Sequence, residues 1–208
     1  MTPLAIQGPI YVATTNAHKA EEIAAILADA LPEGRGIDIR PAPEMPEVIE
    51  DGETFRDNAI LKARAAAAAL GAPALADDSG LAVEALDGAP GVHSARFAGD
   101  PGNDQANNTL LIERLTALGL ADPAAAFVCC VIVAAPDGTI LAEAEGRVEG
   151  VIRWPARGTS GFGYDPLFFH PPSGCRLAEL DAEAKNAISH RGQALRQLAT
   201  RLVGSVQG

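Results

Sequence analysis

The stretch Pro73-Ala74-Leu75-Ala76-Asp77-Asp78-Ser79-Gly80-Leu81-Ala82-Val83 places two adjacent carboxylates between two apolar runs. The residues from Ala74 to Ala85 predict two strand-like segments around an Asp-Asp-Ser-Gly turn. A carboxylate at the end of a buried strand can bind a hard cation such as Mg²⁺, or accept a proton from an attacking water. Because Asp-Asp-Ser-Gly also forms ordinary turns, other segments must decide between a structural and a chemical interpretation.

On both sides of this stretch, predicted strands and helices alternate until a hairpin begins. In the first half of the chain we predict a strand over Ile10–Ala13, a helix over Ala17–Ala30, a short strand near Ile37–Ile39, a helix over Thr54–Leu70 and a loop over Asp87–Gly102. In the second half we predict a helix over Asp104–Leu118, a hairpin of Phe127–Ala134 and Ile140–Val148, a short strand over Pro166–Phe169 and a helix over His190–Val203. The apolar side of the helix over Asp104–Leu118 is predicted to consist of Leu110, Leu111, Leu115 and Leu118. This order favours an α/β fold in which helices flank a mixed sheet, within a single domain spanning residues 1–208.

The composition narrows the classes of partner. The chain has 208 residues, 48% of them apolar, and a net charge of −11, so a nucleic acid polymer is not expected as its partner. A small anionic ligand needs only a few Lys and Arg residues and is compatible with this charge. Cys129 and Cys130 lie in an apolar run, which predicts buried, reduced thiols. The sequence shows no secretory signal and no apolar run of membrane-spanning length, so we expect a cytoplasmic protein without a membrane partner.

Two segments combine a helix start with charged residues. Thr14-Thr15-Asn16-Ala17-His18-Lys19 joins a strand to a helix N-terminus, where free backbone N–H groups attract phosphate. The alternative is an N-cap Asn16 followed by a solvated Lys19. In the second segment, Asn58 and Lys62 lie four residues apart on the predicted inward side of a helix, after the acids of Glu50–Glu53. An inward Lys near acids suggests a role with charge.

Two later segments suit a ligand. Ser160-Gly161-Phe162-Gly163-Tyr164-Asp165-Pro166 contains two glycines, which let the backbone approach a ligand, and two aromatic residues. An aromatic face can stack on a base for roughly 1–3 kcal/mol. A tight turn with core aromatics is the alternative. Lys185 and Ser189-His190-Arg191 precede the last helix, where basic residues oppose the helix dipole and therefore favour an anion or an acceptor oxygen.

Taken together, the motifs resemble the inosine triphosphate pyrophosphatase family, which hydrolyses noncanonical purine nucleoside triphosphates. The resemblance rests on Thr-x-Asn-x-x-Lys-x-x-Glu (Thr14–Glu22), Thr-Phe-x-x-Asn-Ala-x-x-Lys-Ala (Thr54–Ala63), Ala-Asp-Asp-Ser-Gly-Leu (Ala76–Leu81), Gly-Ala-Pro-Gly-Val-His-Ser-Ala-Arg-Phe (Gly88–Phe97), Gly-Phe-Gly-Tyr-Asp-Pro (Gly161–Pro166) and Ser-His-Arg-Gly-x-Ala-Leu (Ser189–Leu195). Each motif alone is modest, and six of them in the right order are specific. Thr15 and His18 stand where many relatives of that family carry glycine.

The resemblance implies an elongated mixed β-sheet flanked by helices, two lobes with a nucleotide cleft between them, a homodimer and Mg²⁺. Carried over by position, Asp78 would be the catalytic base, and the metal would be held by Asp78, Glu50 and Asp77. The substrate would be held by Thr14, Thr15, Asn16, Ala17, His18, Lys19, Lys62, Ser79, Phe162, Gly163, Tyr164, Asp165, Lys185, His190 and Arg191. Because Glu47, Glu50 and Asp51 share a variable stretch, the choice among these acids stays open.

The expected reaction converts ITP, dITP or XTP and water into the nucleoside monophosphate and pyrophosphate. Arg191 is expected to donate to O6 of the base, where adenine carries an amino group instead. Two alternatives stand beside this reaction. A Maf-type nucleotide pyrophosphatase of other base specificity is disfavoured by the Ser-His-Arg and Gly-Phe-Gly-Tyr-Asp motifs. A non-catalytic nucleotide-binding module is disfavoured because Asp77, Asp78 and Lys19 are all present.

Overall fold

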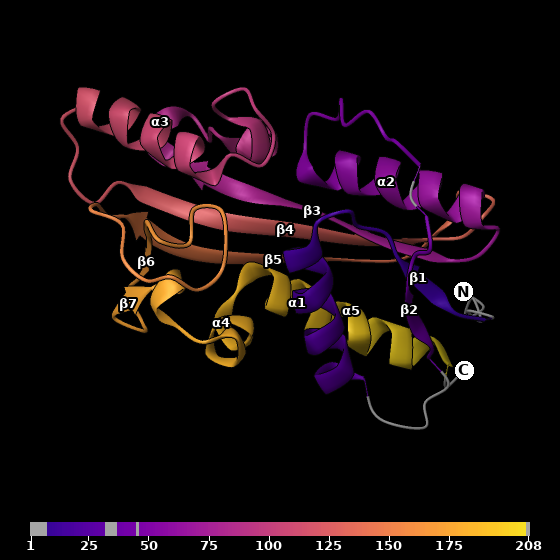
Figure 1. Cartoon of the computed structure of the whole chain (residues 1–208). Helices are drawn as coiled ribbons and strands as arrows, with labels where there is room; N and C mark the ends of the chain where they lie inside the picture. Colours follow the sequence, from indigo (N-terminus) through magenta and orange to yellow (C-terminus); the bar gives the residue numbers. More distant parts are fainter. Residues whose placement is uncertain (1–7, 32–36, 45, 207–208) are drawn as a thin grey trace. The chain divides into compact units, whose positions relative to one another are not determined.

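The computed structural model describes residues 8–31, 37–44 and 46–206, in which the strands form one sheet of order β2-β1-β3-β4-β5-β6-β7 (Figure 1). The strands are β1 (Ile10–Val12), β2 (Ile39–Pro41), β3 (Ala74–Val83), β4 (Ala124–Ala134), β5 (Ile140–Ile152), β6 (Phe168–His170) and β7 (Cys175–Arg176). β1 pairs in parallel with β2 and β3, whereas β6 pairs antiparallel with β5 and β7. The predicted α/β class with a mixed sheet is therefore confirmed.

The chain folds into two compact units whose segments are interleaved in sequence. Unit 1 comprises Met1–Asp78, Cys129–Gly146 and His190–Gly208, and unit 2 comprises Ser79–Val128 and Arg147–Ser189. The long strands β3, β4 and β5 each begin in one unit and end in the other. The single-domain organisation and the cleft expected between two lobes stay predictions.

In unit 1, helices cover both faces of the sheet. α1 (Ala17–Ala30) and α5 (His190–Val206) lie side by side on one face, and α2 (Phe55–Leu70) lies on the other (Figure 1). Alternate residues of the strands divide between these layers, because successive side chains of a strand point to opposite faces. Leu75, Cys129, Val131 and Val133 pack with α1 and α5, whereas Ala74, Ala76, Cys130 and Ile132 pack with the alanines of α2.

The helix boundaries in unit 1 follow local capping signals. Asn16 caps α1 by accepting a hydrogen bond from the Lys19 backbone N–H. Thr54 caps α2, accepting from the Asp57 N–H at 3.1 Å and donating its hydroxyl to the Asp57 carboxylate at 2.7 Å. α2 ends at Gly71, which adopts the left-handed conformation that glycine tolerates best. The predicted bounds of α1 and α2 are confirmed.

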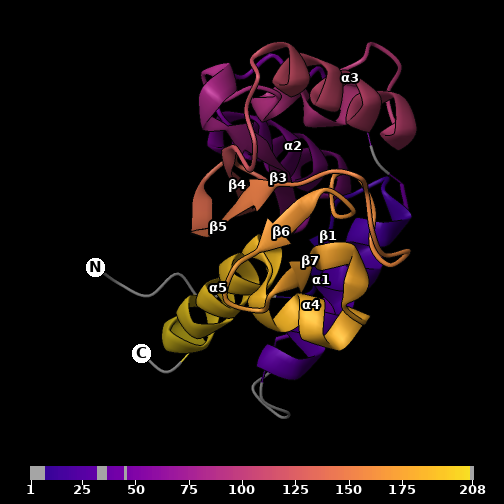
Figure 2. The same cartoon turned by 90° about the vertical axis from the view of Figure 1, so that its left-hand side faces the viewer.

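In unit 2, α3 (Asp104–Ala117) and α4 (Ala182–Ile188) lie on opposite faces of the strands (Figure 2). Leu111 and Leu115 of α3 pack against Leu81, Val83 and other apolar residues of the unit 2 core. Leu118 is 52% exposed, so its predicted place on the buried side is wrong, because α3 ends at Ala117.

Several short elements of unit 2 were not predicted. The predicted loop over Asp87–Gly102 is wrong in part, because it contains a 3₁₀ helix, η2 (Gly91–Arg96). Two more 3₁₀ helices are η1 (Glu84–Leu86) and η3 (Leu177–Glu179). α4 and β7 also had no predicted counterpart. These elements are too short to show the periodicity on which sequence assignment depends.

The Asp-Asp-Ser-Gly segment does not turn, and this prediction is wrong. β3 runs without interruption through all ten residues from Ala74 to Val83, with Asp77 and Asp78 inside it. Gly80 serves close packing instead, because a Cβ atom there would lie 2.7 Å from the Gly91 carbonyl oxygen. The Ser94 hydroxyl of η2 also accepts a hydrogen bond from the backbone N–H of Leu81. η2 thus packs directly against the second half of β3.

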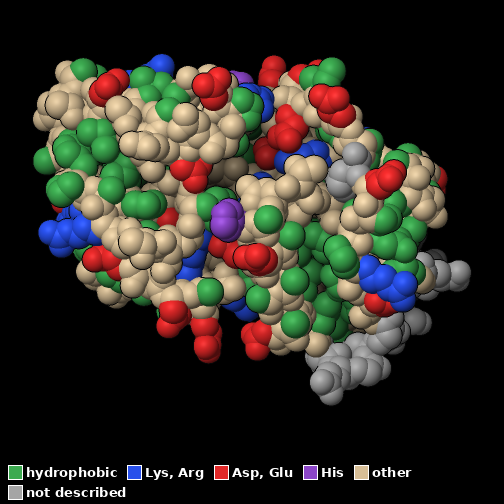
Figure 3. All heavy atoms as spheres, viewed as in Figure 1, with side chains coloured by type: hydrophobic (Ala, Val, Ile, Leu, Met, Phe, Trp, Pro, Cys, Tyr) green, Lys and Arg blue, Asp and Glu red, His purple; other side chains and the backbone are tan. Residues whose placement is uncertain are grey.

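Cys129 and Cys130 of β4 are both buried, which confirms the predicted burial of these thiols in a strand. Burial, together with a hydrogen bond to Glu145, raises the pKa of Cys130 to about 12, so its thiolate is scarce at neutral pH. Among the described residues, no helix is both long and apolar enough to cross a membrane. On the face shown in Figure 3, acidic side chains are interspersed with Lys and Arg.

Candidate functional site

Asp77 is the centre of a buried ion network in unit 1. Its Oδ2 lies 3.2 Å from Lys19 Nζ and accepts hydrogen bonds from Arg191 Nη2 at 3.0 Å and Nε at 3.3 Å. Arg191 Nη1 donates to Glu22 at 2.5 Å, and the side chains of Asp77 and Arg191 are each 1% exposed. Gly146 of β5 permits this approach of α5, because a Cβ atom there would meet the Ala194 backbone nitrogen at 2.6 Å. The network therefore ties α1, β3 and α5 together.

The network keeps Asp77 ionised. Burial raises the pKa of Asp77, but Lys19 and Arg191 outweigh burial and hold that pKa well below its usual range. Burial lowers the pKa of Arg191, and Asp77 and Glu22 reverse this effect, so the guanidinium stays charged. A carboxylate held this way is a poor proton acceptor. Within unit 1, Asp77 fixes the side chains of Lys19 and Arg191.

Asp78 faces the opposite layer, as the alternation along β3 requires. Its Oδ1 accepts a hydrogen bond from Lys62 Nζ at 2.8 Å, and its Oδ2 accepts one from Asn58 Nδ2 at 3.3 Å. Lys62 Nζ also lies 3.4 Å from a Glu50 carboxylate oxygen. Burial raises the pKa of Asp78, and Lys62 only partly opposes that rise. An ionised carboxylate with a raised pKa is a better proton acceptor than an ordinary one.

The start of α2 brings these groups together. Asn58 and Lys62 are one helical turn apart on the inward side, as predicted, and Asn58 is fully buried. Asn58 also accepts a hydrogen bond from the Gly52 N–H at 2.8 Å, which draws the preceding segment against the helix. A Cβ atom on Gly52 would meet Asn58 Oδ1 at 2.7 Å. This close approach places Glu50 beside Lys62.

The loop between β1 and α1 presents an open helix start. Thr15, Asn16, Ala17 and His18 are exposed, Thr14 is half-buried, and α1 carries no acid in its first turn. Such a terminus attracts anions through its free N–H groups and its dipole. Asn16 is an N-cap, as the structural alternative predicts. Lys19 does not extend into solvent, because it pairs with Asp77.

In unit 2, Asp165 organises the glycine-rich loop. Its Oδ2 accepts hydrogen bonds from the Phe162 backbone N–H at 2.9 Å and from Lys185 Nζ at 2.5 Å. Lys185 Nζ lies 4.8 Å from the centre of the half-buried Phe162 ring. Tyr164 is a core residue whose hydroxyl donates to the Ser94 carbonyl at 2.9 Å, so the core alternative holds for this aromatic residue. Phe162 is the aromatic residue of the loop that a ligand can reach.

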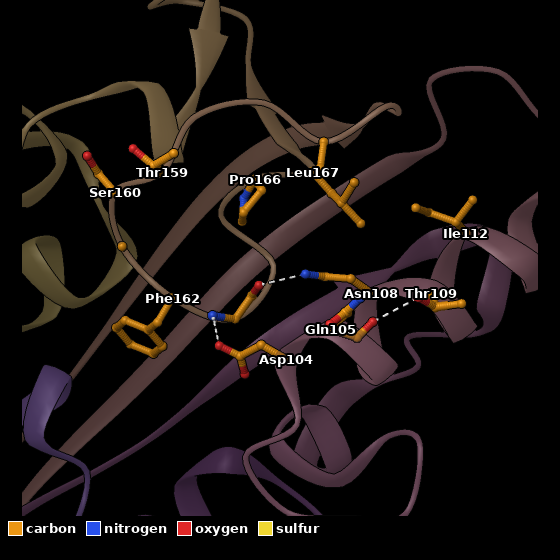
Figure 4. Close-up of a pocket in the computed structure, with 13 residues that line it drawn as sticks. Asp104, Gln105, Asn108, Thr109, Ile112, Thr159, Ser160, Phe162, Pro166 and Leu167 are labelled. Carbon is orange, nitrogen blue, oxygen red and sulfur yellow. Dashed lines mark hydrogen bonds between the residues drawn. The ribbon is translucent and has the colours of Figure 1, made fainter.

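A cavity of about 430 Å³ lies between this loop and α3 (Figure 4). Its volume falls in the range of small-molecule sites. Asp104 and Asn108 contribute polar atoms from α3, Ser160 and Phe162 line it from the loop, and Leu167 adds apolar surface. The lining therefore joins α3 to the loop that carries Phe162.

Some predicted site residues belong neither to the charge cluster around Asp77 and Asp78 in unit 1 nor to the Phe162 loop in unit 2. Ser79 belongs to unit 2 and is half-buried, whereas His190 begins α5 in unit 1 and is 5% exposed. Asn58 and Glu22 contact the site acids or cations but were not among the predicted site residues. Glu22 had a signal, because it lies three residues after Lys19 within one motif. The contacts of Asp104 and Asn108 with the loop had no such signal.

The acids of unit 1 suit a metal through their chemistry. Within the described residues, no three His, Cys, Asp or Glu side chains gather closely enough to hold a metal ion. Asp78 and Glu50 nevertheless both approach the Lys62 ammonium, and Mg²⁺ typically uses one or two carboxylates together with substrate phosphates. Asp77 fits this role less well, because Lys19 and Arg191 already engage it. Glu50, rather than Glu47 or Asp51, is the acid that contacts Lys62.

Residues 10–201 match the model of the family described as Ham1. The chain belongs to the Ham1 family. This membership confirms the resemblance drawn from the six motifs. The curated relatives include a dITP/XTP pyrophosphatase of Geobacter sulfurreducens, 50% identical over 93% of this chain and 96% of that protein. Another is a dITP/XTP pyrophosphatase of Aromatoleum aromaticum, 50% identical with the same coverage.

Solved Ham1 structures have the same fold. A HAM1 protein from Coxiella burnetii matches with a TM-score of 0.84 at 42% identity, covering 94% of this chain and 98% of that one. A structure described as a nucleoside-triphosphatase or dITP/XTP pyrophosphatase from Mycobacterium abscessus matches with a TM-score of 0.72 at 40% identity, covering 92% and 97%. The Ham1 fold thus accounts for nearly the whole chain.

Proposed function

We propose that this protein hydrolyses noncanonical purine nucleoside triphosphates, namely ITP, dITP and XTP, to the nucleoside monophosphate and pyrophosphate. Membership of the Ham1 family and relatives named dITP/XTP pyrophosphatase support this function. The observation that carries the proposal is the environment of Asp78, a buried carboxylate with a raised pKa beside Lys62 and Glu50. That environment suits a proton acceptor next to a bound polyphosphate.

In the proposed reaction, unit 1 holds the triphosphate. The open N-terminus of α1, from Thr14 to Lys19, donates backbone N–H groups to phosphate oxygens. A water attacks the α-phosphorus while its proton passes to the Asp78 carboxylate. The bond between the α-phosphorus and the bridging oxygen breaks, and pyrophosphate leaves with its charge balanced by Lys19 and Lys62. Catalysis of this kind depends on positioning and on electrostatic stabilisation.

We assign Mg²⁺ as the metal, with Asp78 and Glu50 as the carboxylates that would hold it. When bound, Mg²⁺ would neutralise part of the phosphate charge and polarise the reacting groups. Lys62 keeps the two carboxylates close to each other without such an ion, since its Nζ contacts both. Asp77 stays outside this proposed pair. It supports the pair indirectly, by fixing Lys19 and Arg191.

We assign the base to unit 2. Phe162 offers a face for stacking, and Lys185, held by Asp165, is a donor for O6 of hypoxanthine or xanthine. Adenine has an amino group at this position. The Lys185 ammonium and this amino group are both hydrogen-bond donors, so the binding of adenine would weaken. The guanidinium of Arg191 is directed at Asp77 and Glu22, and its contact with O6 stays a prediction.

The assembly and compartment extend this proposal. We propose a homodimer that acts in the cytoplasm on free nucleotides, with neither a nucleic acid polymer nor a membrane as partner. The net charge of −11 supports the exclusion of nucleic acid. Light scattering during gel filtration tests the dimer, because a monomeric mass at micromolar concentration would contradict it.

Pyrophosphate release from purified protein tests the function. ITP, dITP, XTP, GTP and ATP are compared with Mg²⁺ and with a chelator, using the wild type and Asp78→Asn. Asp137→Asn is the matched control, because it makes the same exchange at an exposed turn of unit 1. Rapid release from ITP, dITP and XTP, slow release from ATP and loss in Asp78→Asn alone support the proposal. Nucleotide binding without release would favour a binding module instead.

A further inference from the structure

Two side chains of α3 hold both backbone groups of Gly163. Asp104 Oδ2 accepts a hydrogen bond from the Gly163 N–H at 2.6 Å, and Asn108 Nδ2 donates one to the Gly163 carbonyl at 3.0 Å (Figure 4). Asp104 and Asn108 are four residues apart, so they project from the same side of the helix. Gly163 lies 59 and 55 residues further along the chain. Unit 2 therefore brings two distant segments together at a single peptide position.

The two hydrogen bonds act on a residue with many accessible backbone conformations. Gly163 has a φ of +61°, in the left-handed region, and a glycine can adopt this and other φ values at little cost. The two hydrogen bonds fix the peptide group on each side of the Gly163 Cα. We call the pair of hydrogen bonds from Asp104 and Asn108 the Gly163 clamp. One of the two peptide groups that it fixes joins Phe162 to Gly163, so the clamp acts directly on the backbone of the aromatic residue.

The other contacts of Phe162 come from the opposite side of the loop. Its N–H donates to Asp165, and its ring lies near the Lys185 ammonium. In Figure 4 the ring points away from Asn108 and the rest of α3. α3 therefore fixes the loop on one side, and Asp165 fixes it on the other.

We propose that Asp104 and Asn108 are positioning residues that fix the Phe162 ring for stacking on the base and thereby set the affinity for the nucleotide. The proposal rests on the proposed function, in which Phe162 binds the base. Neither residue is assigned a contact with substrate, and both act through the backbone of the loop. Their loss should raise KM and leave kcat largely unchanged, because unit 1 performs the proposed chemistry.

A purely structural role is the competing interpretation. Asp104 lies in the first turn of α3, where an acid also complements the helix dipole. If that were its whole role, Asp104→Ala would lower the melting temperature and leave KM unchanged. Asp104→Asn separates the two roles, because the amide oxygen can still accept from Gly163 while the charge is lost.

The first experiment measures steady-state hydrolysis of ITP by Asp104→Ala, Asn108→Ala, Asp104→Asn and the control Glu113→Ala. Glu113 is an exposed acid of the same helix and lies outside the lining of the cavity. We expect KM to rise about tenfold in Asp104→Ala and about threefold in Asn108→Ala, since a hydrogen bond to a charged group is the stronger of the two. kcat should stay within about twofold of wild type by the same reasoning. Asp104→Asn should recover most of the affinity, and Glu113→Ala should behave as wild type.

A double-mutant cycle decides whether the effect passes through Phe162. In a Phe162→Leu background, Asp104→Ala should change KM by less than about twofold, because the ring it positions is gone. An undiminished increase in that background, or an unchanged KM in all α3 variants, would overturn the proposal. Should Asp104→Ala not fold, Asn108→Ala carries the same cycle.

The test separates this inference from the proposed function. If the wild type releases no pyrophosphate, the proposed reaction fails, and the same variants are compared by the calorimetric Kd for ITP. A Kd that is weakened in Asp104→Ala and in Asn108→Ala, but not in the control variant, would then still support positioning through Gly163. A wild type that neither hydrolyses nor binds ITP overturns both proposals.

Discussion

The charge cluster of unit 1 and the Phe162 loop of unit 2 are each organised around buried acids, and they differ in what those acids hold. Asp77 and Asp78 meet the cationic side chains of Lys19, Lys62 and Arg191. Asp165 meets the Lys185 ammonium and the Phe162 backbone N–H. The first arrangement balances charge against charge, whereas the second fixes the path of a loop.

This difference predicts different consequences of mutation. Removing a carboxylate from unit 1 leaves buried cations uncompensated, which changes reactivity or stability. Removing a contact from the loop changes the shape offered to a ligand, which changes affinity. The two neighbouring acids of unit 1 also differ in how readily they accept a proton, because the pKa of Asp77 is lowered and that of Asp78 is raised.

The largest expected effect is that of Asp78→Asn on catalysis. The amide cannot accept the proton of the attacking water, so kcat for ITP should fall by about 10³-fold, within the usual range for general base catalysis. KM should change much less. Pyrophosphate release under saturating ITP measures this effect, and a variant that keeps a tenth of the wild-type kcat would exclude Asp78 as the base.

Asp77→Ala should act mainly on stability. Arg191 and Lys19 lose the carboxylate between them, and breaking a buried ion pair from one side typically costs about 3–5 kcal/mol. Urea denaturation measures the free energy of unfolding. The exposed pair of Arg56 and Glu143 supplies the control, since Glu143→Gln should change that free energy by no more than about 0.5 kcal/mol. Equal losses in both variants would mean that the network around Asp77 is not special.

Phe162→Leu should weaken nucleotide binding. Base stacking on an aromatic ring is worth roughly 1–3 kcal/mol, so KM for ITP should rise about tenfold at nearly constant kcat. Phe97→Leu is matched to it, because Phe97 also lies in unit 2 with a cation, Arg114, over its ring. A similar rise in KM for both variants would argue against a specific role of Phe162.

The smallest expected effect is a shift in the pH profile of Lys62→Gln. Asp78 must be ionised to accept a proton, so kcat/KM should fall as the pH drops through its pKa. Burial raises this pKa above the ordinary 3.8, and Lys62 counteracts that rise. Removing Lys62 should therefore move the acidic limb to higher pH. Initial rates at constant ionic strength give the limb, and a shift toward lower pH would contradict this account of Asp78.

The sequence predicts the features that local interactions determine. The caps Asn16 and Thr54 and the inward pair Asn58 and Lys62 depend on residues within one helical turn, so their spacing is sufficient evidence. The uninterrupted course of β3 could not be predicted in this way. Two adjacent carboxylates stay inside a strand because cations from α1, α2 and α5 compensate them, and these cations come from distant segments.

The same reasoning separates the predicted from the unpredicted parts of the site. The motifs identify Asp78, Lys19 and Arg191 but not which group each one contacts, and Arg191 lies 114 residues beyond Asp77. The hydrogen bonds from Asp104 and Asn108 to Gly163 could not be predicted from the sequence for the same reason. Asp104 and Asn108 resemble ordinary surface residues of a helix until the fold brings the loop to them.

The packing of α1 against α5 has a consequence for the order of events during synthesis. Ile23 and Leu27 of the first helix share one core with Leu195 and Leu198 of the last, and Arg191 reaches back to Glu22 and Asp77. While the ribosome is still translating the middle of the chain, Asp77 therefore lacks the Arg191 guanidinium. Unit 1 can complete its core only after α5 has been translated. Contacts so far apart in sequence are typical of slow folding, so we expect α1 to lack its α5 packing partners until the end of synthesis.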